Sequence, residues 1–115
     1  MVTLSRRILL VEDCPEVREL AALCLRHGGW EVLSAGSLAQ ARDYSTVSID
    51  AVLTDLELPD GLGTTLTSVF GSPLILFSAK PPDKLPDGVC GSIKKPFDPA
   101  VLPRQVEDIL RVPPA

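Results

Sequence analysis

Aromatic residues are scarce in this chain of 115 residues, where Phe, Trp and Tyr together make up 4%. The sequence therefore offers little of the aromatic stacking surface on which single-stranded nucleic acids are commonly bound. Positive charge is also in short supply, because 15 Asp and Glu outnumber 11 Lys and Arg and the net charge is -4. An acidic chain repels a phosphate backbone, so we expect neither DNA nor RNA as a partner.

Cysteines and long apolar runs are limited as well. The three cysteines, Cys14, Cys24 and Cys90, have no Cys-x-x-Cys spacing, which argues against a disulfide framework and a zinc site. The longest apolar run covers residues 20–25, far short of the roughly 18 residues of a membrane span. The apolar segment 8–11 is too short for a signal peptide. We therefore expect a cytoplasmic protein with no membrane partner.

Short apolar runs alternate with amphipathic segments, which is typical of βαβ units that build a parallel sheet. The length and an apolar content of 45% fit one domain, which we expect to span residues 1–115 with a core of about 6–112. The predicted fold is a doubly wound α/β fold with a five-stranded parallel sheet. Its expected strands are Arg7–Val11, Trp30–Ser34, Ala51–Thr54, Leu74–Phe77 and Val89–Ile93.

Start and stop signals predict the first two helices. Pro15 is a favoured first-turn residue, and the glycines at 28–29 end the first helix. Ser37 with Gln40 three residues later forms a capping-box pattern at the start of the second helix. We expect this second helix to end near Tyr44.

The later helices are compressed or interrupted. The span between Asp55 and Ser78 leaves room for only a short third helix. Prolines at 81, 82 and 86 predict that the fourth helix is short or absent. The last helix has start signals at residues 98–99, but Pro103 lies a turn further on, so we expect a kink or a later start.

Polar residues end four of the expected strands, and ligands of an open parallel sheet bind at the carboxyl ends of its strands. These residues are Glu12 and Asp13, Asp55, Ser78, and Lys94 and Lys95. Three carboxylates at one edge repel one another unless a cation is bound, and an oxygen-only set suits Mg²⁺. A lysine and a hydroxyl beside that metal suit a phosphoryl group, and Asp55 then becomes a candidate nucleophile for an aspartyl phosphate.

Four motifs stand in order along the chain, namely residues 8–13 (ILLVED), residues 55–63 (DLELPDGLG), Ser78-Ala79 and Lys95-Pro96-Phe97. Together they resemble the receiver domain of two-component response regulators, and the resemblance covers nearly the whole chain. It implies a flavodoxin-like sheet with strand order 2-1-3-4-5. It also implies that Asp55 accepts a phosphoryl group from a histidine kinase or a histidine phosphotransfer protein, which docks along the helix that begins at Pro15.

The resemblance also assigns the other site residues. Mg²⁺ is held by Glu12, Asp13, Asp55 and the backbone carbonyl of Glu57. Ser78 and Lys95 bind the phosphoryl group, and the Lys95-Pro96 peptide bond is expected to be cis.

Two features depart from the family pattern or vary within it. The switch position that usually carries an aromatic side chain is Ser92 here. Glu57 and Lys80 each lie two residues beyond a site residue, at positions that line the phosphoryl entrance in the family. We expect this pair to attract each other across the entrance and to tune the rates of phosphorylation or hydrolysis.

Three functions remain open at this point. The first is a stand-alone receiver without an output domain, which signals by protein contact. We expect such a receiver to be a phosphoacceptor rather than an enzyme. Its own reactions would be slow phosphorylation by small phosphodonors and slow self-dephosphorylation. The second is a degenerate receiver that binds a partner regardless of phosphorylation. The third is a Mg²⁺-dependent phosphatase with an aspartyl-phosphate intermediate. The sequence names neither the kinase nor the target, and it leaves open whether the chain forms a homodimer.

Other conspicuous residues are interpreted structurally. We expect Cys24 and Cys90 to be core residues. His27 falls in the last turn of the first helix, where a cation interacts favourably with the helix dipole, so it is not interpreted as a phosphotransfer histidine. Gly61 and Gly63 are interpreted as turn residues, because the spacing of a nucleotide-binding loop is absent.

Overall fold

The computed structural model describes residues 6–111. Five parallel strands form one sheet in the order β2-β1-β3-β6-β7. These strands are β1 (Arg7–Val11), β2 (Glu31–Ala35), β3 (Ala51–Asp55), β6 (Leu74–Ser78) and β7 (Val89–Lys94). A two-stranded antiparallel ribbon, β4 (Glu57–Leu58) and β5 (Gly61–Leu62), follows β3. The predicted fold class and strand order are confirmed, while the predicted core limit at residue 112 lies outside the described residues.

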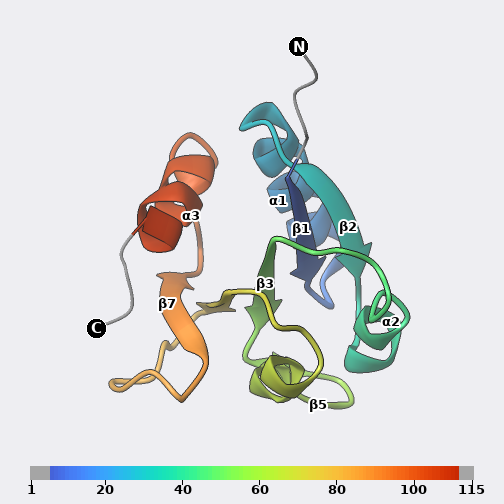
Figure 1. The fold of residues 1–115 in the computed structure, drawn as a ribbon. Coiled ribbons are helices and arrows are strands. Elements are labelled where there is room, and N and C mark those ends of the chain that lie inside the picture. The colour runs from blue at the N-terminus through green and yellow to red at the C-terminus, as the bar shows by residue number, and fades with distance from the viewer. Residues whose placement is uncertain (1–5, 112–115) are drawn as a thin grey trace.

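Helices cover both faces of the sheet (Figure 1). α1 (Pro15–His27) and α3 (Leu102–Arg111) pack on one face, against a core that includes Leu10, Leu53 and Phe77. α2 (Leu38–Arg42) and the 3-10 helix η1 (Gly63–Ser68) pack on the other, against side chains that include Leu9, Val52 and Leu76. The central strands are apolar on both sides because each side is covered. Each fully buried leucine contributes roughly 1.5–3 kcal/mol of transfer free energy.

The predicted helix boundaries hold at three of four ends. α1 begins at Pro15 and is capped by Gly28, and the Ser37 side chain accepts a hydrogen bond from the Gln40 backbone at the start of α2. α2 ends at Arg42, two residues before the expected Tyr44.

The expected start of β2 at Trp30 is one residue early. The backbone N–H of Trp30 donates to the carbonyl of Leu25 at 3.1 Å, so this residue beyond the end of α1 is bonded to the last turn of that helix rather than to the sheet. Its side chain is buried in the core between the sheet and α1.

The start of α2 has a second cap that comes from a distant loop. The Asp60 carboxylate accepts hydrogen bonds from the backbone N–H groups of Leu38 at 2.8 Å and Ala39 at 3.0 Å. These two donors hold the pKa of Asp60 below its usual value. Gly61 follows with φ +144°, a conformation that L side chains rarely adopt. The loop after β3 is thereby fastened to α2.

The region between β3 and β7 is as compressed as the sequence indicates. The third helix is only the 3-10 helix η1, and residues 79–88 between β6 and β7 form turns and coil without a helix. Along β7, Gly91 and Ile93 are buried, with Gly91 against Ile109 of α3, whereas Cys90 is exposed. The prediction that Cys90 is a core residue is therefore wrong, because no helix follows β6 to cover that face of β7. Cys24 is buried, as predicted.

α3 begins at Leu102, so Pro103 falls in its first turn. Proline is tolerated there because the first N–H groups of a helix have no partner within the helix. The later start is therefore the alternative that the structure confirms. Within residues 6–111, no helix combines the length and the apolar content that a bilayer crossing requires.

Candidate functional site

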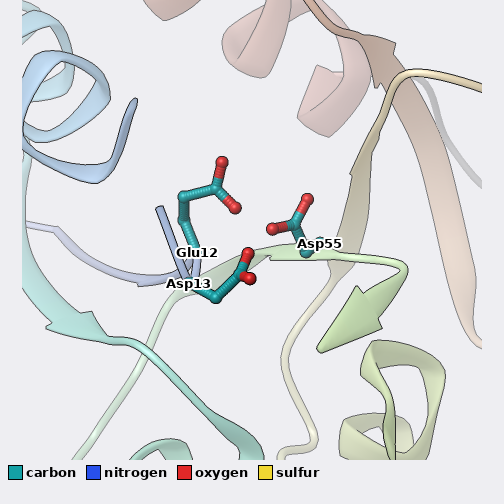
Figure 2. Close-up of side chains that lie close together, drawn as sticks. All are labelled: Glu12, Asp13 and Asp55. Carbon is teal, nitrogen blue, oxygen red and sulfur yellow. The ribbon is translucent and has the colours of Figure 1, made fainter. Parts of the chain in front are cut away.

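Three carboxyl groups converge at the carboxyl edge of the sheet. Glu12 and Asp13 directly follow β1, Asp55 ends β3, and these two strands are neighbours in the sheet. Their carboxylate oxygens lie within 4.8 Å of one another, and Figure 2 shows the three side chains close together. Glu12 and Asp55 are buried while Asp13 is exposed. The set consists of oxygen donors alone, which fits a hard cation such as Mg²⁺.

Lys95 supplies positive charge to the two buried carboxylates. Its Nζ donates to Glu12 Oε1 at 3.0 Å and also to Asp55 Oδ1. The backbone N–H of Lys95 donates to the carbonyl of Ser78 at 2.9 Å, which fixes the lysine beside the end of β6. Burial raises the pKa of Asp55, and the hydrogen bond and charge of Lys95 oppose that rise. The ammonium group therefore favours the ionised form of Asp55.

A cavity of about 330 Å³ opens beside these groups. It is lined by Asp13, Asp55, Leu56, Glu57, Ser78, Ala79, Lys80 and Lys95. The backbone N–H of Lys80 donates to Ser78 Oγ at 3.2 Å. Although Glu57 and Lys80 both line the cavity, the ion pairs found among the described residues do not include one between them.

The backbone at Asp55 is held by close packing. Gly63 donates its N–H to the carbonyl of Leu56 at 2.8 Å. A Cβ added at Gly63 would lie 2.0 Å from the carbonyl oxygen of Asp55 and 2.7 Å from Thr54 Oγ1. The 3-10 helix can reach this position only because residue 63 has no side chain.

The segment after β7 closes the other side of the site. The Lys95-Pro96 peptide bond is cis, as expected from the family resemblance. Phe97 packs against Phe77 with ring centroids 5.3 Å apart. Ser92, at the position of the usual switch aromatic, is paired in register with Leu76 within the sheet.

Sequence reasoning missed one side chain that supports this site. Arg18 of α1 is half-buried, and its Nη1 donates to the backbone carbonyl of Glu12 at 2.8 Å. The helical spacing of the sequence places Arg18 on the same side of α1 as Ala21, Ala22 and Leu25, which are buried in the core. A charged residue on a buried stripe requires a polar partner.

Known proteins are similar in sequence to this chain over nearly its whole length. No family model matches the sequence. The DNA-binding response regulator MtrA of Mycolicibacterium smegmatis is 31% identical over 121 residues, covering 96% of this chain and 53% of that protein. The probable transcriptional regulatory protein TcrX of Mycobacterium tuberculosis is 28% identical, covering 90% of this chain and 46% of that protein. The chain thus spans about half the length of these curated relatives.

Among solved structures, the receiver domain from the hybrid histidine kinase CckA is 31% identical, with a TM-score of 0.76 over 91% of this chain and 99% of that one. The chain belongs to the response regulator receiver domains. The chemotaxis response regulator CheY4 of Vibrio cholerae shares the receiver fold with a TM-score of 0.81 at 18% identity, covering 92% of this chain and 99% of that one. Receiver domains are signalling phosphoacceptors rather than classical enzymes, and they generally bind Mg²⁺ in an acidic pocket.

Proposed function

We propose that this receiver domain accepts a phosphoryl group on Asp55 from a histidine kinase or a histidine phosphotransfer protein, with Mg²⁺ as cofactor, and passes the signal on by protein contact. The proposal depends above all on one observation. Three carboxyl groups lie within 4.8 Å of one another beside Lys95, at a cavity that Ser78 also lines. A phosphoryl group brings negative charge into such a site, so the cation and the lysine together are needed to offset it.

The residues have separate roles in the proposed transfer. An Asp55 carboxylate oxygen forms a bond to phosphorus while the bond from phosphorus to the donor histidine nitrogen breaks, and the donor, protonated on its other ring nitrogen, leaves as neutral imidazole. Glu12, Asp13, Asp55 and the Glu57 carbonyl would hold Mg²⁺. The bound ion supplies positive charge for the phosphoryl oxygens.

The other polar groups act on the phosphoryl group after it arrives. Lys95 would pair with one phosphoryl oxygen, and Ser78 would donate a hydrogen bond to another. Lys95 Nζ lies 5.2 Å from the centroid of the Phe77 ring, which packs against Phe97 in the core on the side of α1 and α3.

Intact mass after incubation with Mg²⁺ and acetyl phosphate tests the acceptor. We expect one phosphoryl adduct on the wild type and none on Asp55→Asn, because an amide lacks the nucleophilic carboxylate. Asp43→Asn is the matched control, since Asp43 is an exposed residue after α2, and it should keep the adduct.

Other results of this experiment favour other functions. A folded wild type that takes no phosphoryl group, either from acetyl phosphate or from a phosphorylated histidine phosphotransfer protein, would favour a phosphorylation-independent interaction module. Steady turnover of a phosphomonoester would favour the Mg²⁺-dependent phosphatase.

An apolar groove next to the acidic site supports donor docking along α1. It has a volume of about 530 Å³, and its lining includes Val17 and Leu20 of α1 together with Pro96 and Phe97. Leu20 is 43% exposed, and Leu23 on the next turn is 52% exposed. These side chains would bury against the donor protein while its histidine reaches Asp55.

Charge placed in this groove should separate donor docking from chemistry. We expect Leu20→Glu to slow phosphoryl transfer from a histidine phosphotransfer protein about tenfold, because a carboxylate replaces buried apolar contact. Transfer from acetyl phosphate should not change. Leu85→Glu, at an exposed leucine of the coil between β6 and β7, is the control. Equal slowing with both donors would contradict docking at α1.

Glu57 and Lys80 are proposed to tune the rates, because both line the cavity through which a phosphodonor or water must pass. We expect Lys80→Ala and Glu57→Ala each to change the rate of phosphorylation or of hydrolysis several-fold, measured by mass spectrometry over time. If both rates stay at the wild-type value in both variants, the two residues have no such role.

A further inference from the structure

The guanidinium of Arg18 connects the acidic loop to the neighbouring strand end. Its Nη1 donates to the carbonyl of Glu12 at 2.8 Å. The same nitrogen lies against Gly36, where an added Cβ would be 3.0 Å from it. The Gly36 N–H in turn donates to Gln40 Oε1 at 2.6 Å. One side chain of α1 thus contacts both the end of β1 and the turn between β2 and α2.

The bonded carbonyl belongs to the peptide group between Glu12 and Asp13. The sheet holds the other side of Glu12, because its N–H donates to the carbonyl of Ala35 at 2.9 Å. β1 ends at Val11, so the Glu12 carbonyl lies beyond the ladder of the sheet and takes its hydrogen bond from Arg18. The orientation of this peptide fixes the directions in which both acidic side chains leave the backbone.

We propose that Arg18 is a positioning residue for the divalent cation. By holding the peptide between Glu12 and Asp13, it keeps both carboxylates directed at Asp55. This inference rests on the proposed Mg²⁺ site but assigns a role to a residue outside the ligand set.

Loss of the positive charge and loss of positioning predict opposite effects of removing Arg18 on the affinity for Mg²⁺. A positive guanidinium near an acidic site repels a cation, so its loss would strengthen Mg²⁺ binding. Loss of positioning weakens binding, because partners that orient metal ligands typically contribute about ten- to a hundredfold in affinity. The sign of the change therefore distinguishes the two effects.

The test is calorimetric titration of Mg²⁺ into the wild type, Arg18→Met, Arg18→Lys and Arg26→Met. We expect Arg18→Met to bind Mg²⁺ about tenfold or more weakly. Arg18→Lys should recover part of the loss, since an ammonium group can still donate to the Glu12 carbonyl. Arg26 is an exposed arginine of the same helix, so Arg26→Met removes the same charge and should leave the affinity close to that of the wild type.

Urea denaturation in EDTA separates positioning from loss of fold, since the metal-free stability of each variant is measured without the ion. Unchanged or tighter Mg²⁺ binding by a folded Arg18→Met overturns the proposal. If that variant does not fold, Arg18→Gln is measured in its place, because a glutamine side chain is too short to donate to the Glu12 carbonyl. Unchanged Mg²⁺ binding by a folded Arg18→Gln would likewise overturn the proposal. A wild type that binds no Mg²⁺ overturns the proposed cofactor and, with it, the basis of this inference.

Discussion

Lys95→Met is expected to lower the free energy of unfolding of the metal-free protein by about 2 kcal/mol at neutral pH. The substitution leaves the buried carboxylates of Glu12 and Asp55 next to each other without the ammonium that contacts both. Loss of one partner from a fully buried ion pair costs about 3–5 kcal/mol. We expect less here because the site opens on a cavity and the Lys95 side chain is 23% exposed.

Urea denaturation followed by circular dichroism in EDTA measures this loss. Lys94→Met is the matched control, because Lys94 is the preceding, exposed lysine. It should be nearly as stable as the wild type. Saturating Mg²⁺ should restore much of the stability of Lys95→Met, since the ion takes over the neutralisation of the carboxylates. If the two methionine variants are equally stable in EDTA, Lys95 has no such role.

The pH dependence of Lys95→Met follows from the same charges. Burial already raises the pKa of Asp55 in the folded wild type, and removal of Lys95 takes away the group that opposes this rise. A carboxyl group whose pKa is higher in the folded than in the unfolded state lowers the free energy of unfolding as the pH rises from the unfolded-state pKa through the folded-state pKa. The difference in stability between Lys95→Met and the wild type should therefore shrink as the pH falls towards the unfolded-state pKa of about 3.9.

Gly63→Ala is expected to lower the free energy of unfolding by about 3 kcal/mol. The new methyl group would lie 2.0 Å from the carbonyl oxygen of Asp55, so either the start of η1 or the end of β3 must move. The cause is close packing rather than backbone conformation, because Gly63 is not among the glycines with positive φ. Folded Gly63→Ala should also accept phosphoryl groups more slowly, since its Asp55 is displaced.

Gly71→Ala provides the control, because a Cβ there has no neighbour within 4 Å and φ is not positive. That variant should have the stability of the wild type or gain about 0.5 kcal/mol through a less flexible unfolded state. Denaturation midpoints in urea compare the two substitutions directly. Equal midpoints for both alanine variants would show that η1 adapts without strain.

Local patterns were sufficient to predict where the acidic side chains meet. The apolar runs before Glu12 and Asp55 mark two buried strands, and the parallel arrangement brings their carboxyl ends to one edge. The capping pattern at Ser37 and the glycine at 28 likewise depend on neighbours within a few residues, and both predictions are confirmed. The caps follow from the sequence because their partners lie within a few residues along the chain. The acidic cluster follows because parallel strands all end at the same edge of the sheet.

Features that depend on distant partners were not predicted. Asp60 caps a helix that begins 22 residues before it, and no local pattern connects the two. Cys90 lies in an apolar run that suggested burial, yet its exposure depends on whether a helix covers that side of β7. In the structure, buried Gly91 and Ile93 alternate with less buried neighbours along β7, which is the period of two of a strand with one open face.

Trp30 is the only tryptophan of the chain, and it immediately precedes β2, at the amino edge of the sheet. The acidic site lies at the carboxyl edge, one strand length away, roughly 16 Å for five residues. The indole ring of Trp30 is buried, and the Arg6 guanidinium lies 4.2 Å from the centroid of this ring. Intrinsic fluorescence is therefore an optical reporter of unfolding that Mg²⁺ does not quench by contact. The same emission signal can compare stability with and without the ion, while binding of the ion itself has to be followed by heat or by mass.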